Sequence, residues 1–302
     1  MGEEITASGQ HSLSKGVKNY LSLVTFSHTV FAMPFALVGF TMGVSRTGHF
    51  DWWLLLKVVL CMVFARSAAM AFNRYLDRDI DALNPRTKKR EIPAGVISER
   101  SAFAFVVINC LVFIFTAYLI NPLCFYLSPV ALAVILGYSY TKRFTALCHY
   151  VLGIGLGLAP IGAYLAVTAS FDWIPVILGG MVLTWVAGFD IIYSLQDDRF
   201  DQENRLHSIP SLLGRKNALM VSNISHMISA VGLICTLILM KDPFPEVSYI
   251  GYLGAAVFLL MLVYQHTLVS ENDLKRVNIA FMTTNGIASL VFGALIIIDF
   301  FI

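Results

Sequence analysis

The sequence predicts an all-α polytopic membrane protein in which about nine transmembrane helices surround a central cavity. Two observations carry this prediction. First, 57% of the 302 residues are hydrophobic and only 13% are charged. Second, the apolar residues lie in long runs rather than alternating with polar ones. Ordinary soluble domains carry about 25% charged residues, so this composition excludes that class.

Nine apolar segments each reach the roughly 20 residues that a helix needs to cross a bilayer. They run over about 21–44, 53–75, 101–120, 122–140, 146–168, 173–196, 217–240, 247–268 and 277–300. Glycine and proline within several of them suit packed membrane helices better than β-barrel strands. The connections are short, so 21–302 is predicted to be a single membrane domain behind a polar cytoplasmic tail, 1–20.

The basic residues are distributed unequally between the two ends of these segments. Seventeen of the 21 Lys and Arg residues lie in the tail, in the connections after segments 2, 4, 6 and 8, or at the helix ends beside them. Only Arg46 and Lys241 lie on the opposite side. By the positive-inside rule, the basic side faces the cytoplasm. We therefore expect a multi-pass protein of the inner (cytoplasmic) membrane.

A first acidic cluster follows the second apolar segment. Asn73, Asp77 and Asp81 are spaced four apart, which places them along one face of a helix. Two carboxylates and an amide so close together repel one another unless a cation lies between them. Mg²⁺ prefers such oxygen ligands and shares its shell with water and substrate phosphates.

A second cluster follows the sixth segment and repeats this spacing. Tyr193, Asp197 and Asp201 lie 120 residues after the members of the first cluster, which indicates a weak parallel internal repeat. An even number of helices separates the two clusters, so both reach the same membrane surface. Asp190 lies a turn deeper, where a carboxylate is costly and is by default a functional candidate.

Basic residues follow both clusters on the same side. Those that we interpret as binding a diphosphate are Arg86, Lys88, Lys142, Arg143 and Arg205. Acidic motifs for metal, basic residues beside them and an apolar region beneath suit a ligand with a diphosphate head and a hydrocarbon tail.

These motifs resemble those of the UbiA-type intramembrane prenyltransferases. The family's NxxxDxxxD motif matches Asn73, Asp77 and Asp81, and its DxxYxxxDxxxD motif matches Asp190, Tyr193, Asp197 and Asp201. An arginine before the first motif corresponds to Arg66, and a tyrosine-rich segment ending in Lys-Arg includes Tyr138 and Tyr140. The nine segments agree as well, so the resemblance covers nearly the whole chain.

The resemblance implies Mg²⁺-dependent transfer of a polyprenyl group from its diphosphate to an aromatic acid acceptor, with membrane lipid as the surroundings and no nucleic acid as partner. The residues that it implies fall into three groups. The catalytic residues are Asp77, Asp81, Asp197, Asp201 and Tyr193. The metal ligands are Asn73, Asp77, Asp81, Asp190, Asp197 and Asp201. The acceptor is bound by Arg66, His28 and Tyr138.

The first segment bears on the acceptor. 4-Hydroxybenzoate enzymes of the family carry a Lys-Pro stretch there, whereas this chain reads TFSHTVFAMPFALVG and has His28 in place of the basic residue. The chain most resembles a bacterial branch that serves menaquinone synthesis through a dihydroxynaphthoate. Both acceptors stay open, in ubiquinone or menaquinone biosynthesis.

Other functions remain as alternatives. Within the family these are prenylation of haem, chlorophyll or a glyceryl ether lipid. A cation-coupled transporter would more commonly show inverted repeats with broken helices at the midplane. A membrane scaffold would not need two matched acid clusters.

Arg66 raises a separate question, because an unpaired guanidinium within the apolar layer is costly. It lies seven residues before Asn73, on roughly the same face and two turns deeper. Its expected partner is Asp190 or another acid of the protein, the diphosphate, or the carboxylate of the acceptor.

Overall fold

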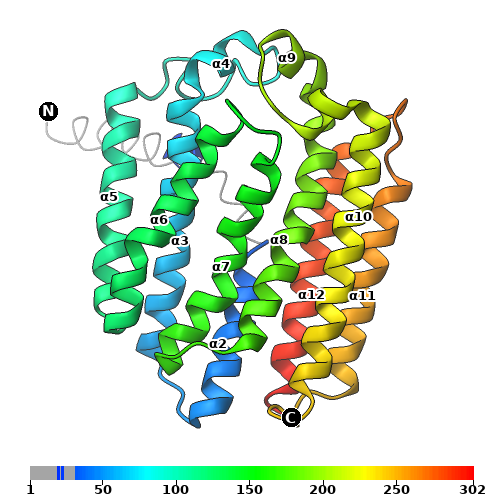
Figure 1. Ribbon diagram of the computed structural model, residues 1–302. Helices are drawn as coiled ribbons and strands as arrows, with labels where there is room; N and C mark the ends of the chain where they lie inside the picture. The colour runs from blue at the N-terminus through cyan, green and yellow to red at the C-terminus, as the bar shows by residue number, and fades with distance from the viewer. Residues whose placement is uncertain (1–18, 21, 24–30) are drawn as a thin grey trace, which may run out of the picture.

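The structure is a computed structural model that describes residues 19–20, 22–23 and 31–302. The described residues form a bundle of helices standing side by side (Figure 1). The helices are α2 (Met33–Thr47), α3 (Trp52–Leu76), α4 (Arg78–Leu83), α5 (Glu99–Tyr118), α6 (Pro122–Thr141), α7 (Cys148–Thr168), α8 (Trp173–Ser194), α9 (Asp198–Glu203), α10 (Ile209–Met240), α11 (Tyr249–Thr267) and α12 (Thr284–Asp299).

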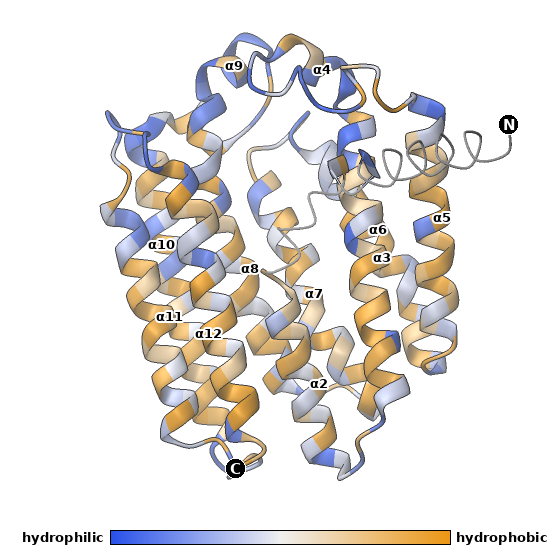
Figure 2. Ribbon diagram, turned by 180° about the vertical axis from the view of Figure 1, so that it is seen from behind, coloured by the Kyte–Doolittle hydropathy of each residue, from blue (hydrophilic) through white to orange (hydrophobic). Residues whose placement is uncertain are grey.

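The predicted membrane fold is confirmed. Within the described part of the chain, eight helical spans are long and apolar enough to cross a membrane. The predicted crossing at 21–44 is described only from its middle onward, as α2. Figure 2 shows hydrophobic residues along the helices and hydrophilic ones gathered at the end that carries α4 and α9.

The helices form two groups joined by a central pair. In both views, α3, α5 and α6 lie on one side, α10, α11 and α12 on the other, and α7 and α8 between them (Figures 1 and 2). The central pair packs very closely, because a Cβ atom at Gly157 of α7 would lie 2.5 Å from the carbonyl oxygen of Gly179 in α8. Small residues let helix backbones approach in this way, which fixes side chains on α7 relative to those on α8.

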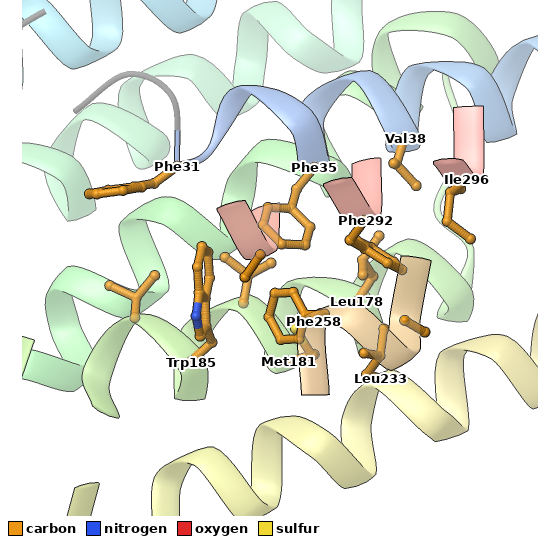
Figure 3. Packing of buried hydrophobic residues seen from close by; sticks show 14 of the residues in the cluster. Phe31, Phe35, Val38, Leu178, Met181, Trp185, Leu233, Phe258, Phe292 and Ile296 are labelled. Carbon is orange, nitrogen blue, oxygen red and sulfur yellow. The ribbon is translucent and has the colours of Figure 1, made fainter. Parts of the chain in front are cut away.

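Aromatic residues fill the interior on the other face of α8. The Trp185 ring lies 5.3 Å from the Phe35 ring and 5.4 Å from the Phe258 ring, centroid to centroid (Figure 3). Phe292 adds α12 to this cluster, with its ring 5.8 Å from that of Phe35. The tilted arrangement is the one that the ring quadrupoles favour, and it holds α2, α8, α11 and α12 together.

The internal repeat appears in the backbone. α3 ends at Leu76, Asp77 has φ −90° and ψ 8°, and the six-residue α4 follows. After α8 and the short 3-10 turn Leu195–Asp197, Asp197 has φ −108° and ψ 5°, and the six-residue α9 follows. Each motif was predicted to lie on one continuous helix face. Instead, its middle aspartate forms a junction at which the chain turns over the end of the bundle.

Two boundaries differ from the prediction. α10 begins at Ile209 rather than near 217, and Gly214, with φ 77° and ψ 164°, interrupts it after the first turn. Only glycine adopts such a backbone without strain. The last helix is preceded by a π-helical turn, Ile279–Thr283, a local widening that often marks functional regions.

Candidate active site

The two repeated motifs meet at one polar cavity. Its volume is about 210 Å³, and it lies between the end of α3, the end of α8 and the connections that carry α4 and α9. Its polar lining comprises Asn73, Asp77, Asp81, Asn84, Arg86, Thr87, Arg90, Tyr138, Ser139, Lys142, Arg143, His149, Asp190, Tyr193, Ser194, Asp197 and Ser208. Segments 120 residues apart in the chain thus form a single site.

The first motif is held by basic residues from two other segments. Asn73 Nδ2 donates a hydrogen bond to Asp77 Oδ2 at 3.1 Å, while Arg143 Nη2 lies 3.0 Å from Asp77 Oδ1. Arg90 Nη1 donates to both carboxylate oxygens of Asp81, each at 2.8 Å. The motif therefore has one cation for each carboxylate.

The second motif is held by a residue of the first repeat. Arg86 forms a bidentate ion pair with Asp197, with Nε 3.0 Å from Oδ1 and Nη2 on Oδ2. Asn84 Nδ2 donates to the same Oδ1 at 3.1 Å. The connection after α4 thereby bridges the two repeats across the cavity.

Asp201 does not line the cavity, although it is one of the predicted metal ligands. Its side chain is fully buried, with Lys142 Nζ 2.7 Å from Oδ1 and Ser208 Oγ donating to Oδ2 at 3.0 Å. Lys142 itself faces the cavity. Asp201 therefore positions Lys142 from behind the cavity wall, and its role as a metal ligand stays a prediction.

Charge and burial raise the pKa values of two of these groups, for different reasons. Burial raises the pKa of Asp77 to about 6, against the opposing effect of Arg143. Burial alone would lower the pKa of Lys142, but the Asp201 carboxylate more than offsets this and leaves that pKa above its ordinary value. At neutral pH the cavity therefore presents ionised carboxylates and protonated amines together.

Asp190 differs from the other acids of the cavity. The residues beside it in the sequence are apolar, and its Oδ2 lies 2.7 Å from His149 Nδ1 on α7. His149 Nε2 in turn accepts a hydrogen bond of 3.3 Å from the backbone N–H of Ile209. Among the described residues, neither Arg66 nor any other Arg or Lys forms an ion pair with Asp190. Asp190, one of the partners considered for Arg66, therefore does not pair with it in this structure.

Tyr193 links the motif to the aromatic interior. Its ring stacks on Phe281 of the π-helical turn, with centroids 4.2 Å apart and planes 29° apart. Its hydroxyl accepts a hydrogen bond of 3.1 Å from Arg86 Nη1. Tyr193 is therefore rigidly placed at the boundary between the charged and apolar parts of the site.

A larger apolar cavity of about 320 Å³ adjoins the polar one. Tyr138 and Leu152 line both cavities, so the two share a wall. Arg66 faces the apolar cavity, and its buried Nε has no hydrogen-bond partner in the described part of the chain. A buried, unpaired guanidinium favours binding of an anionic group that the protein itself does not provide.

Three predicted residues do not join this set. Lys88 and Arg205 are exposed and do not line the polar cavity, and their contact with a diphosphate stays a prediction. His28 lies outside the described residues. In return, the structure adds Asn84, Arg90 and His149 to the cavity. His149 has no motif around it in the sequence, since only the fold brings α7 against α8.

The donor set suits a divalent cation in its chemistry. Within the residues that the structure describes, no group of three or more His, Cys, Asp or Glu side chains is placed to hold a metal ion, because each carboxylate is paired with a base. Mg²⁺ needs only one or two protein carboxylates when phosphate oxygens and water complete its shell. Asp77 and Asp197, each beside an amide side chain, fit that requirement.

Comparison with known proteins places these features in a family. The model of the UbiA prenyltransferase family matches residues 32–287. The chain is 29% identical over 244 residues to the 4-hydroxybenzoate octaprenyltransferase of Nitrosospira multiformis, covering 81% of this chain and 82% of that one. It is 27% identical over 248 residues to the enzyme of the same name from Aliivibrio fischeri, covering 81% and 83%.

Solved structures share the fold. A UbiA homologue from Aeropyrum pernix superposes with a TM-score of 0.79 at 32% identity, covering 90% of this chain and 98% of that one. A UbiA homologue from Archaeoglobus fulgidus, solved with GPP and Mg²⁺, superposes with a TM-score of 0.73 at 18% identity, covering 94% and 100%.

Proposed function

Because the chain belongs to the UbiA prenyltransferase family and is therefore a prenyltransferase, we propose that it transfers a polyprenyl group from a polyprenyl diphosphate to an aromatic acid, as a step of ubiquinone or menaquinone biosynthesis. The observation that carries this proposal is the junction of the two cavities. A charged cavity built from two aspartate motifs adjoins an apolar cavity that contains an unpaired arginine.

The polar cavity would hold the diphosphate. We assign Arg86, Lys142 and Arg143 to its oxygens, because all three line the cavity and are already oriented by carboxylates. Asn73, Asp77, Asp81 and Asp197 would hold Mg²⁺, which when bound neutralises the charge that builds on the leaving diphosphate. The A. fulgidus homologue was solved with the same kind of ligand.

The apolar cavity would take the reacting end of the prenyl chain and the ring of the acceptor. Arg66 is placed to pair with the acceptor carboxylate, since the described residues offer it no acid. Tyr138 lines both cavities, with Arg66 in the apolar one and Asp190 in the polar one. The relatives named 4-hydroxybenzoate octaprenyltransferase support an aromatic acid as the acceptor.

The reaction then follows from the arrangement. The allylic C–O bond breaks, its electron pair leaves with the diphosphate, and the ring carbon of the acceptor bonds to the allylic carbon. Tyr193, stacked on Phe281, presents a π face and a fixed hydroxyl where the allylic cation develops. The ring carbon finally loses its proton. Asp190 lines the polar cavity and its Oδ2 is bound to His149, so we assign its Oδ1 to the acceptor rather than to the metal.

The site is proposed to face the cytoplasm from the inner membrane. The basic connections surround it, and water-soluble acceptors reach it from that side.

A direct assay tests the proposed function. Purified protein in detergent or lipid is incubated with Mg²⁺, a prenyl diphosphate, and either 4-hydroxybenzoate or a dihydroxynaphthoate, and products are read by mass spectrometry. We expect one acceptor to gain the mass of the prenyl group, and only when Mg²⁺ is present. No prenylated product from either aromatic acid would overturn the proposed acceptor class.

A further inference from the structure

His149 is a buried titratable residue whose two ring nitrogens are both engaged, although it carries no known motif. It lies on α7 with 2% of its surface exposed, between Asp190 on α8 and the first residue of α10, Ile209. Its partner Asp190 is the first aspartate of the second motif; the partners of Asp77, Asp81, Asp197 and Asp201 are instead arginine and lysine.

The two hydrogen bonds determine where the imidazole carries its proton. The backbone N–H of Ile209 can only donate, so His149 Nε2, 3.3 Å away, is the acceptor and carries no hydrogen. Nδ1 therefore carries a proton, which it donates to Asp190 Oδ2 at 2.7 Å. The donation fixes the orientation of the Asp190 carboxylate.

The result is a carboxylate with one occupied and one open oxygen. Asp190 Oδ1 has no hydrogen-bond partner in the described part of the chain, and Asp190 lines the polar cavity with 24% of its side chain exposed. The other acids facing the cavity have arginine partners that a diphosphate would compete for. Among these acids, Asp190 alone is held by an imidazole.

We propose that His149 is a positioning residue, which holds Asp190 so that Oδ1 receives the proton lost from the aromatic acceptor. The inference rests on the proposed function. In the step concerned, the C–H bond of the prenylated ring carbon breaks, its electrons restore the aromatic sextet, and the proton passes to Oδ1. A freely rotating carboxylate would spend part of its time turned away, which slows this step without weakening substrate binding.

Two substitutions separate this role from a purely structural one. In His149→Asn, the amide nitrogen takes the place of Nδ1, which keeps the donor to Asp190 and loses the acceptor for Ile209. In His149→Gln, the longer side chain brings an oxygen to the place of Nε2, which keeps the bond to Ile209 and loses the donor to Asp190. Both residues are neutral and of similar size.

The experiment compares wild type and both variants with whichever of 4-hydroxybenzoate and a dihydroxynaphthoate wild type prenylates, with and without deuterium on the acceptor ring. We expect His149→Asn to keep kcat within about threefold of wild type, and His149→Gln to lower it by about a hundredfold. KM for both substrates should stay within about twofold in each variant. Proton loss should limit His149→Gln alone, so ring deuteration should slow that variant by about threefold or more and leave wild type unchanged.

Opposite results would overturn the proposal. They are equal kcat in the two variants, a larger loss in His149→Asn, or a low kcat in His149→Gln with no isotope effect. If folded wild type prenylates neither 4-hydroxybenzoate nor a dihydroxynaphthoate, the proposed function fails first, and the role of His149 fails with it. Turnover by wild type with the wrong order of variants overturns the role of His149 alone.

Discussion

Two nitrogens of the Arg86 guanidinium donate hydrogen bonds to the carboxylate of Asp197, although the two residues lie 111 positions apart in the chain. Arg86 belongs to the connection that follows the first motif, and Asp197 is the middle aspartate of the second. This contact connects the two repeats, which together line one cavity. It also places an anion-binding side chain where a diphosphate would meet both motifs.

Removing one charge from either motif should abolish most activity without unfolding the protein. Asp77→Asn and Asp197→Asn each keep the side-chain volume and lose an anionic oxygen, so we expect turnover to fall on the order of a hundredfold. Asp79→Asn is the matched control, because Asp79 is exposed beside the same motif. Steady-state prenyl transfer at fixed Mg²⁺ measures the effect. Wild-type turnover in both motif variants would contradict the assignment.

Arg86 should contribute to affinity for the prenyl diphosphate through its planar fork. Arg86→Lys keeps the charge and loses the bidentate geometry, so KM for the diphosphate should rise about tenfold, which corresponds to about 1.4 kcal/mol. The same substitution at the exposed Arg205 should change KM less than about twofold. Equal effects at the two positions would show that only net charge matters.

Arg66 should act on the other substrate. Arg66→Lys is expected to raise KM for the aromatic acid by about tenfold and to leave KM for the prenyl diphosphate nearly constant, because Arg66 lines the apolar cavity and not the polar one. Initial rates with each substrate varied in turn provide both constants. An equal loss for both substrates, or loss of folded protein, would make Arg66 part of the scaffold.

Asp77 should make stability depend on pH when metal is removed. Its pKa, raised by burial to about 6, exceeds the value near 4 of an unfolded aspartate, so the folded protein binds the proton more tightly. Its contribution to the free energy of unfolding is therefore full below about pH 4 and is lost as pH rises through about 6. Relative to Asp77→Asn, wild type should lose on the order of 2 kcal/mol between pH 4 and pH 7.

Unfolding in detergent with a chelator, followed at several pH values, measures this difference. Added Mg²⁺ should remove it near neutral pH, because a bound cation favours the ionised carboxylate. A wild-type stability that rises over this range relative to Asp77→Asn would have the wrong sign.

Topology can be tested by labelling. Lys88 and Lys241 lie on opposite sides of the predicted membrane domain, and both are exposed. Cysteines introduced there should react with a membrane-impermeant maleimide from opposite faces, with Lys88→Cys reacting only from the cytoplasmic one. Labelling of both positions from the same face would contradict an odd number of membrane crossings between Lys88 and Lys241.

Much of this account was available in the sequence. Long apolar runs predicted the membrane helices, and the 120-residue interval predicted that the two motifs form parallel repeats. The junctions at Asp77 and Asp197 were missed because four-residue spacing reads as helix whether or not the axis bends between the residues. The early start of α10 was missed because Gly214 and the polar residues Arg215, Lys216 and Asn217 separate its first residues from the long apolar run.

The limits of sequence reasoning are clearest for the partners of charged groups. Asp190 was one of the partners considered for Arg66, but α7 brings His149 closer, and only helix packing determines this. Asp201 has the same motif spacing as Asp81, yet it lies behind Lys142 and not in the cavity. Lys88 and Arg205 are basic residues beside the two motifs and could bind an anion, but the fold leaves both exposed to solvent.

The central claim is that the two motifs form one Mg²⁺–diphosphate site. The most direct measurement is Mg²⁺-dependent binding of a non-hydrolysable prenyl thiolodiphosphate to wild type, Asp77→Asn, Asp197→Asn and the double variant. If both aspartates serve one site, each single variant should lose most of the affinity, and the double variant should lose clearly less than the sum of the two losses in free energy. Fully additive losses, or binding by wild type that does not depend on Mg²⁺, would contradict the account.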